Sequence, residues 1–348
     1  MKKIKIGNRL VGEGEPCYII AEVGSNFDGS MERAKKLVDL SKEVGADAVK
    51  FQSFLVDKII SEEAFTEKTS FQAKWDKPVY QVYQDAVFPR EWHKEISDYC
   101  KGKNIDFFSS PYDTEAVDLL VKIGVPAIKI GSGDITFLQI LEYIAKKGKP
   151  IILGTGASTM AEIEKAVNVI RKAGNDQLIL LQCITNYPSP FEQANIKAMV
   201  TLREKFNVPV GYSDHTPGSV VPLGAVALGG CVIEKHFTDD KKRKGPDHPY
   251  AMDVDDFRSM VKDIRLLEKA LGSYEKKLET AEKETVMLQR RSVYTKTDIP
   301  KGTVVTSDML EILRPAKGIL PEQIKMIINK KAKVDLKKGE VLTLDKIG

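Results

Sequence analysis

The sequence predicts a (β/α)₈ barrel, the TIM-barrel architecture, followed by a small β-rich domain. Short apolar runs rich in β-branched residues alternate with amphipathic helical segments, which is the pattern of a parallel sheet built from βα units. Eight such runs occur before residue 272, and a chain of 348 residues is long enough for a barrel of about 250 residues plus a small module. After Gly272 the pattern changes to charged residues and short strands separated by glycine-containing turns.

The predicted elements follow one another regularly. The eight strands are expected at residues 18–23, 48–51, 106–109, 127–130, 151–154, 178–183, 208–212 and 231–237. Clear helices are expected at 31–44, 91–103, 114–123, 160–173 and 255–271, several of them opening with a Ser, Thr or Asp cap. Eight strand and helix pairs favour a closed barrel.

One connection is too long for a simple βα loop. Residues 56–90 carry Trp75, Tyr80 and Tyr83 among polar residues before the next helix. Loops of this length usually have a function, and in a barrel this one follows the second strand, on the catalytic face. We expect it to cover the active site.

The predicted domains are a catalytic barrel at residues 1–272, a linker at 273–287 and a β-rich module at 288–348. A module of about sixty residues is small for independent stability and would gain by docking on a barrel.

Composition excludes several classes of protein. Hydrophobic residues make up 42% and charged residues 29%, and the net charge of +4 is spread over mixed charges, so we expect no nucleic-acid and no membrane partner. The four cysteines are far apart and fit no zinc or redox motif, which favours buried thiols in a reducing compartment. With no long apolar stretch and no apolar run after the N-terminal lysines, a cytoplasmic protein is expected.

Polar residues gather at the carboxyl ends of nearly all the predicted strands, where barrel enzymes place their catalytic groups. A single polar residue at a strand end is often only a solvated loop residue, but coincidence across eight strands is improbable. The residues concerned are Glu22, Lys50, Gln52, Ser109, Ser110, Lys129, Ser132, the 154–156 GTG turn, Thr185, Asn186, Tyr187, Ser213, Asp214, His215, Glu234 and His236.

Two of the four histidines, in the motifs SDH (His215) and EKH (His236), follow the last two strands. Neutral imidazoles on adjacent strand ends can share one divalent metal ion. The alternative is that the histidines only hydrogen-bond loops. Two nitrogen ligands completed by oxygen or water suit manganese best, with Mg²⁺ or Co²⁺ as other candidates.

Lys50 and Lys129 are expected to converge from the second and fourth strands, with the hydroxyls of Ser110, Ser132 and Ser213 around the same mouth. This set would hold a phosphate and a carboxylate. The backbone amides of the 154–156 GTG turn can add anion-binding donors, although such a turn alone is a weak signal. Lys50 could instead be a Schiff-base nucleophile if burial lowered its pKa.

The motifs together resemble the sialic acid (nonulosonate) synthase family over essentially the whole chain. They are IIAEVGSNFDGS, GADAVKFQ, FFSSPYD, AIKIGSGD, IILGTG, YPSPFE, VGYSDHT, GAVALGGCVIEKHFT and GPDH. The tail, with RRSVYTKTDIPKG and LRPAKGI, resembles the antifreeze-protein-like (SAF) domain of that family.

The resemblance implies that phosphoenolpyruvate and an N-acylated amino sugar condense with water to a nine-carbon 2-keto acid and phosphate. It also implies a domain-swapped homodimer, in which Arg314 reaches the sugar bound by the partner subunit. In this reading the metal ligands are His215 and His236; the phosphoenolpyruvate contacts are Lys50, Ser110, Lys129, Ser132 and Ser213; the sugar contacts are Glu22, Gln52, Tyr187, Asp247 and Arg314; and the catalytic residues are Glu22, Lys50, Lys129 and Asp134.

Three positions depart from the family pattern. Phe27 follows Asn26 where the family usually has histidine, Asp134 replaces a glutamate thought to handle protons, and Gly154 replaces a serine. A carboxylate remains at residue 134, so activity is expected to persist.

Three other functions compete with this one. Synthases that act on phosphorylated aldoses use related barrels but lack the tail domain, and a Schiff-base aldolase would need no metal. A catalytically inactive carbohydrate-binding or scaffold protein is supported only by the three departures. The sugar stays open among N-acetylmannosamine, its 6-phosphate and the 2,4-diacetamido-trideoxyhexoses: GPDH favours the neuraminic and legionaminic branches, KWDKPVYQVYQDA the pseudaminic one.

Overall fold

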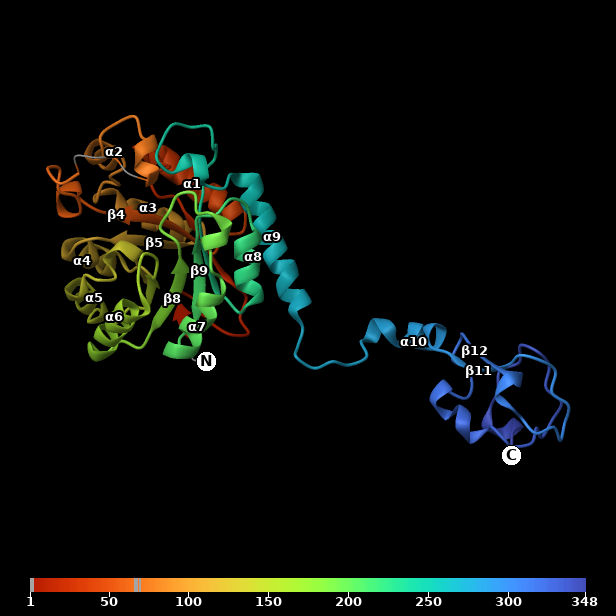
Figure 1. The fold of residues 1–348 in the computed structure, drawn as a ribbon. Helices are drawn as coiled ribbons and strands as arrows, with labels where there is room; N and C mark the ends of the chain where they lie inside the picture. The colour runs from red at the N-terminus through yellow and green to blue at the C-terminus, as the bar shows by residue number, and fades with distance from the viewer. Residues whose placement is uncertain (1–2, 66–67, 69) are drawn as a thin grey trace. The chain divides into compact units, whose positions relative to one another are not determined.

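A computed structural model describes residues 3–65, 68 and 70–348 and divides the chain into two units, one ending at Gly272 and one running from Ser273 to Gly348 (Figure 1). Each unit has its own buried core. Within the described residues, none of the helices combines the length and the apolar character needed to cross a membrane.

The first unit contains the predicted parallel barrel. Among the described residues its eight strands are β3 (Tyr18–Glu22), β4 (Ala48–Ser53), β5 (Asp106–Pro111), β6 (Ile128–Ile130), β7 (Ile151–Gly154), β8 (Leu178–Cys183), β9 (Val210–Asp214) and β10 (Val232–His236). They are hydrogen-bonded in the order β5-β4-β3-β10-β9-β8-β7-β6, so the first barrel strand pairs with the last. Strands β5 and β6, at the two ends of this order, are also in contact, which confirms the barrel.

Helices surround these strands (Figure 1). They are α1 (Met31–Glu43), α3 (Trp92–Gly102), α4 (Thr114–Ile123), α5 (Leu138–Ala145), α6 (Met160–Lys172), α7 (Lys197–Phe206), α8 (Val220–Ala227) and α9 (Val254–Leu271). Local sequence sets several of their starts: Ser30, Asp113 and Asp253 each accept a backbone N–H of the first turn, and Thr159 forms a capping box with Glu162.

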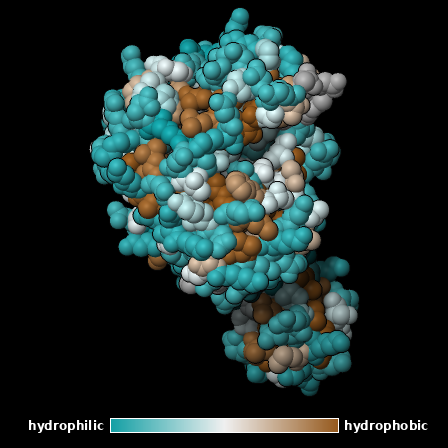
Figure 2. All heavy atoms as spheres, turned by 90° about the vertical axis from the view of Figure 1, so that its left-hand side faces the viewer, coloured by the Kyte–Doolittle hydropathy of each residue, from teal (hydrophilic) through white to brown (hydrophobic). Residues whose placement is uncertain are grey.

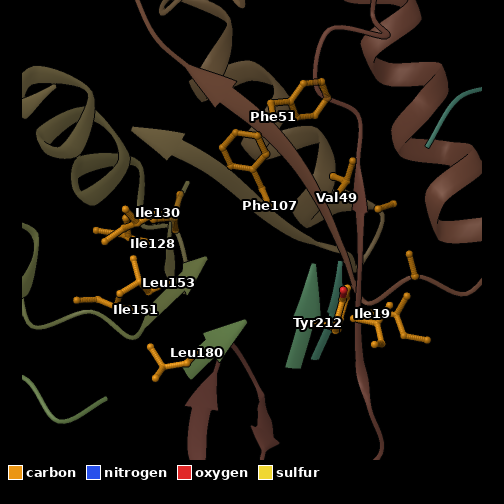
Figure 3. Packing of buried hydrophobic residues seen from close by; sticks show 14 of the residues in the cluster. Ile19, Val49, Phe51, Phe107, Ile128, Ile130, Ile151, Leu153, Leu180 and Tyr212 are labelled. Atoms are coloured by element: carbon orange, nitrogen blue, oxygen red, sulfur yellow. The ribbon is translucent and has the colours of Figure 1, made fainter. Parts of the chain in front are cut away.

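Alternate residues of each strand point to opposite faces of the barrel wall. One set packs against the helices; Figure 3 shows Ile128 and Ile130 beside Ile151 and Leu153 in this outer core. The other set fills the barrel, where Ile20 and Ile152 belong to a second cluster. A hairpin of β1 (Ile4–Ile6) and β2 (Arg9–Val11), absent from the predicted elements, contributes apolar side chains to this inner cluster.

The described part of the long connection after β4, which leaves out residues 66, 67 and 69, contains regular elements. It contains short 3₁₀ turns at Val56–Lys58 and Ser70–Lys74 and an unpredicted helix, α2 (Val79–Asp85). Its side chains form a small apolar cluster of their own around Phe54, Ile60 and Val79. This packing gives the connection a defined shape.

The second unit pairs β11 (Ser292–Thr295) with β12 (Leu310–Leu313) in an antiparallel hairpin. Short 3₁₀ turns at Ser307–Met309, Pro321–Met326 and Leu344–Lys346 separate its strands and bridges. Part of the segment expected as a linker is helical, because it contains α10 (Lys283–Gln289). The backbone N–H of Ala316 donates a hydrogen bond to Met287 O in this helix, so α10 belongs to the second unit.

The molecular surface matches the ordinary globular composition. On the face shown in Figure 2, hydrophilic residues predominate and hydrophobic residues occur in separate patches.

Candidate active site

The inward series of residues changes from apolar to polar toward the carboxyl end of each strand. Register places neighbours side by side: Glu22 of β3 lies opposite Lys50 of β4, and Ser213 of β9 lies opposite Glu234 of β10. Alternation from buried Ile20 or Ala48 leads to these residues two positions later. The barrel therefore gathers Glu22, Lys50, Ser213 and Glu234 at one mouth, whereas Ser109 contacts His93 of α3 and Asp214 is bonded by Lys235.

A balanced network of four charges lies in this mouth, all of it buried. Lys50 Nζ is 2.7 Å from Glu22 Oε2 and 3.9 Å from Glu234 Oε2. Lys129 Nζ is 3.4 Å from Glu234 Oε1, to which Ser213 donates a hydrogen bond of 2.9 Å. Glu234 thus connects both predicted anion-binding lysines, a role that strand-end composition alone had not singled out.

The network sets the protonation of its members. Burial opposes the charge on Lys50, but the carboxylates of Glu22 and Glu234 outweigh it, so the pKa of Lys50 is raised. Burial works against ionised Glu234 too, yet Lys129 and Lys50 hold its pKa low. Burial raises the pKa of Glu22, an effect that Lys50 opposes and Glu234 strengthens. A raised pKa keeps the amine of Lys50 protonated and so makes it a poor nucleophile, which disfavours the Schiff-base mechanism.

His215 and His236 come together with their ring centroids 5.5 Å apart. Nδ1 of His215 lies 2.8 Å from Ile184 O; since a carbonyl only accepts, Nδ1 carries the proton and Nε2 presents its lone pair. Burial lowers the pKa of His215 to about 3 and that of His236 to about 4, so both rings are neutral at pH 7.

These two imidazoles fit a divalent metal ion. Nδ1 of His236 is buried without a hydrogen-bond partner in the structure, as expected of a nitrogen available for another partner. In the described part of the chain, no group of three or more His, Cys, Asp or Glu side chains is arranged to hold a metal ion. Any ion here would take its remaining ligands from water or substrate, as in open catalytic sites.

A pocket of about 380 Å³ is lined in part by His236. Its polar lining includes Gln52, Asp134, Tyr187, His236 and Asp247, so four predicted site residues share it with one predicted metal ligand. The β4–α3 connection supplies the other wall, and its placement over the pocket matches the expected cover.

Hydrogen bonds fix the polar side of this pocket. Gln52 Nε2 donates to Glu22 Oε1 at 2.8 Å. The backbone N–H and the hydroxyl of Ser25 both donate to Asp247 Oδ2 at 2.9 Å, and Tyr250 donates to the other oxygen. The ring of Tyr187 lies 4.2 Å from that of His215, centroid to centroid. The protein itself therefore holds Gln52 and Asp247, two of the predicted sugar contacts, in place.

The remaining predicted anion contacts lie around the lysines. Ser110 Oγ is 3.4 Å from Lys50 Nζ, and Ser132 Oγ accepts a hydrogen bond of 3.0 Å from Gly156 N. A Cβ on Gly154 would stand 2.6 Å from Ser132 Oγ, closer than real Cβ contacts. The glycine at 154 thus leaves Ser132 room to bond the GTG turn.

The other two departures from the family pattern, Phe27 and Asp134, lie in different environments. Phe27 is fully buried and packs edge-to-face on Phe88, 5.1 Å between centroids, within an aromatic cluster that includes Phe51 and Trp92. It is a core residue and does not line the pocket. Asp134 does line it, with Oδ2 buried and lacking a hydrogen-bond partner in the structure, so a carboxylate remains available there.

Some residues serve the site indirectly. His248 of GPDH is bonded on both sides, through Nδ1 to Thr238 Oγ1 at 2.7 Å and through Nε2 to Asp28 Oδ1 at 2.9 Å, so it fixes a loop. Lys235, between Glu234 and His236 in sequence, points away from the mouth and donates hydrogen bonds to Asp214 and to two backbone carbonyls. Side chains two residues apart on a strand point to the same face, so Glu234 shares the face of His236 and could have been identified from the sequence.

Arg314 belongs to the second unit, where it follows β12. Its side chain is exposed and its Nε donates a hydrogen bond of 2.6 Å to Gln289 O.

Comparison with known proteins agrees with this geometry. The NeuB family model matches residues 37–276 and the SAF domain model matches residues 290–348. The N,N'-diacetyllegionaminic acid synthase of Campylobacter jejuni is 42% identical, over 93% of this chain and 98% of the relative, and the pseudaminic acid synthase of the same species is 37% identical, over 97% and 98%. The crystal structure of N-acetylneuraminic acid synthetase from Leptospira borgpetersenii, in complex with citrate, superposes with a TM-score of 0.73 at 33% identity, covering 82% of this chain and 95% of that one. The chain therefore belongs to the NeuB family and ends in a SAF domain, which confirms the resemblance found in the sequence.

Proposed function

We propose that this protein is a nonulosonate synthase that condenses phosphoenolpyruvate with an N-acylated amino sugar and water, giving a nine-carbon 2-keto acid and phosphate. The observation that carries the proposal is the meeting of charged Lys50 and Lys129 with neutral His215 and His236 at one barrel mouth. Relatives named as legionaminic and pseudaminic acid synthases support it.

Phosphoenolpyruvate is assigned to the lysine side of the mouth. Its phosphate and carboxylate replace Glu22 and Glu234 as partners of Lys50 and Lys129, and the hydroxyls of Ser110, Ser132 and Ser213 complete the cradle. Because both lysines already form ion pairs in a buried site, little reorganisation accompanies binding.

The sugar is assigned to the adjoining pocket, with its aldehyde toward the histidines. His215 and His236 would hold a divalent ion, manganese before Mg²⁺ or Co²⁺. When bound, such an ion supplies Lewis-acid polarisation of the aldehyde. Gln52, Glu22, Tyr187 and Asp247 bind the sugar hydroxyls and fix its orientation.

The reaction then needs one new carbon–carbon bond. C3 of phosphoenolpyruvate attacks the sugar aldehyde carbon, and water adds to the cationic C2; one proton of that water is passed on to the former aldehyde oxygen, which becomes a hydroxyl. The tetrahedral product expels phosphate by cleavage of the C2–O bond, its C2 hydroxyl gives the second proton to the departing phosphate, and the ketone remains. Lys50 and Lys129 stabilise the negative charge of the departing phosphate, and Asp134 accepts the proton of the attacking water.

Two features of the proposal concern the whole protein. A domain-swapped homodimer would bring exposed Arg314 to the sugar of the other subunit. A cytoplasmic location agrees with four buried free cysteines.

The pH dependence of the reaction tests Asp134. Burial raises the pKa of Asp134 to about 6, so the carboxyl is neutral below that pH and ionised above it. Turnover is expected to rise with pH through about 6 as the carboxylate base forms. Asp134→Asn is expected to lose this rising limb of the pH profile, and its kcat is expected to fall by about 10²- to 10⁴-fold. Asp134→Glu, which restores the family residue, is expected to keep the limb. A limb unchanged in Asp134→Asn assigns it to another group, such as Glu22.

Phosphate release tests the whole proposal. With manganese, phosphoenolpyruvate and an N-acylated amino sugar, release is expected to depend on the sugar and to stop with a chelator. Sugar-dependent release that persists with the chelator would keep the condensation and remove the metal from the proposal. No phosphate release with any sugar, combined with sugar binding measured by calorimetry, would support an inactive carbohydrate-binding protein.

A further inference from the structure

A buried ion pair lies directly behind the two candidate metal ligands. Lys235 of β10 and Asp214 of β9 are neighbours in the strand register, and their side chains are 1% and 0% exposed. Both point away from the mouth, because the preceding residue on each strand points into it. Asp214 directly precedes His215 in the chain, and Lys235 directly precedes His236.

The two histidines are held in different ways. His236 is the last residue of β10 and pairs with Glu22 of β3 in the parallel sheet. His215 follows the last residue of β9, so none of the strand pairings of the described residues includes it. Its carbonyl accepts the N–H of Ser189 at 2.9 Å, and its Nδ1 donates to Ile184 O. The course of the chain on either side of His215 has to be fixed by other groups.

The ion pair fixes this course. The ammonium group of Lys235 donates to the Asp214 carboxylate, to the backbone carbonyl of Thr216 and, at 3.0 Å, to that of Gly218. An ammonium group has three N–H donors, so all of them are used. Asp214 in turn accepts the backbone N–H of Thr216 at 3.0 Å and its hydroxyl at 3.1 Å. The turn after β9 thus wraps around one buried cation, and this turn carries His215.

Stability alone gives little reason to bury this pair. Taking two charges out of water costs free energy that their attraction barely offsets, and well-packed apolar residues of similar volume often stabilise a fold equally well or better. Apolar residues cannot supply direction, whereas a hydrogen bond restricts both the distance and the angle between the groups that it joins. The pair is therefore better explained by a need for position than by its contribution to folding.

The adjacent histidines have such a need. Their ring centroids lie 5.5 Å apart, and in the described part of the chain no third His, Cys, Asp or Glu side chain joins them in a metal-binding group. Functional side chains have to be held within about 0.5 Å of their productive geometry. With only two protein donors, a displacement of His215 would therefore weaken half of the protein's hold on an ion.

We propose, resting on the nonulosonate synthase function above, that Lys235 and Asp214 are positioning residues of the metal site. The ammonium group of Lys235 holds the turn after β9, so that the imidazole of His215 stays beside that of His236. Neither Lys235 nor Asp214 enters the mouth, because both side chains lie on the outer side of the barrel wall.

A double variant separates positioning from stability. Lys235→Met alone would leave Asp214 as an unpaired buried charge, which strongly destabilises a fold. Lys235→Met combined with Asp214→Asn removes both charges at similar volume, so the melting temperature of the metal-free protein is expected to stay close to that of the wild type. The turn loses the cation that holds its carbonyls, and the affinity for manganese is expected to fall by about 10- to 100-fold, the range for lost support of a metal ligand.

Two further variants accompany the double variant. Asp214→Asn alone leaves Lys235 on both carbonyls, so its loss of manganese affinity is expected to lie between those of the wild type and the double variant. Arg265→Met is the matched control, because Arg265 of α9 lies 3.2 Å from Asp47, which precedes β4 at the opposite end of the barrel. This control is expected to lose thermal stability and to bind manganese as the wild type does.

Manganese affinity is measured by titration, with free Mn²⁺ followed by electron paramagnetic resonance, and melting by circular dichroism in the presence of a chelator. Phosphate release is measured at limiting and at excess manganese. At limiting manganese the double variant is expected to turn over about 10- to 100-fold more slowly than the wild type. Excess manganese is expected to restore part of the rate, which a loss of folded protein would not allow.

Wild-type manganese affinity in both the double variant and Asp214→Asn overturns the inference and leaves the condensation intact. An equal loss of manganese affinity in Arg265→Met overturns it too. If the wild type binds manganese but releases no phosphate with any sugar, the proposed function is refuted, and the manganese affinities of the variants still decide the inference. A wild-type protein that binds no manganese overturns the inference together with the metal assignment.

Discussion

His236→Ala is expected to abolish turnover, with a fall in kcat of roughly a thousandfold or more. The imidazole of His236 is buried, neutral and lacks a hydrogen-bond partner on Nδ1 in the structure, so its loss removes a metal donor without breaking an internal bond. Polarisation of a carbonyl by a bound metal is worth several kcal/mol, which corresponds to this factor. Metal content by atomic spectroscopy and turnover by phosphate release are measured on the same preparation.

His93→Ala is the matched control for this variant. His93 is also buried and its pKa is also lowered by burial, to about 4, but it bonds Pro89 O and Ser109 and lies in α3, outside the pocket. This variant is expected to lose thermal stability and to keep both its metal and its turnover per folded molecule. If His236→Ala retained activity with an unchanged metal content, the assignment of His236 as a ligand would be wrong.

Lys50→Met is expected to lower kcat/KM for phosphoenolpyruvate by about 10²- to 10³-fold, the loss typical of one removed electrostatic donor. The ammonium group of Lys50 contacts Glu22, Glu234 and Ser110, so it is the most connected cation of the network. Without it Glu22 takes up a proton more readily, because burial already raises its pKa. The fold is therefore expected to tolerate the change.

Steady-state kinetics with each substrate varied in turn measures this effect. Lys146→Met removes an exposed lysine of a surface ion pair and is expected to behave as the wild type. Lys50→Arg keeps the charge with a different shape and is expected to recover only part of the activity. Borohydride reduction of the wild-type enzyme with the keto acid product should give no lysine adduct; a mass increase on Lys50 would restore the Schiff-base mechanism.

Much of the architecture was determined by the sequence. Hydrophobic patterns with periods of 2 and 3.6 residues are local signals, so the eight barrel strands and the main helices could be located from the sequence alone. The α2 helix was not predicted because it is short, lies within a polar-looking connection and is stabilised by packing around Phe54 and Val79. The N-terminal hairpin escaped prediction for a similar reason, since its strands have only three residues each.

The candidate site, too, was predictable from the sequence only in part. Strand-end position and motif identity were enough to select Lys50, Lys129, His215 and His236, because the carboxyl ends of barrel strands meet at one face. Protonation was decided only by tertiary structure: two carboxylates close to Lys50 raise its pKa, whereas burial by the surrounding chain lowers that of both histidines. Such effects depend on distances between residues far apart in sequence, and no local pattern records them.

The same distinction applies to the three unusual residues. The sequence determined that Phe27, Asp134 and Gly154 differ from the family pattern, but only packing showed that Phe27 fills the core, that Gly154 leaves space for Ser132 and that Asp134 faces the pocket. Trp75 and Tyr83 stood out in the sequence of the long connection, but only the structure showed that Phe54, Ile60 and Val82 line the same pocket. Local chemistry thus pointed to the proposed reaction, and the contacts between distant segments specified the environment of the candidate site.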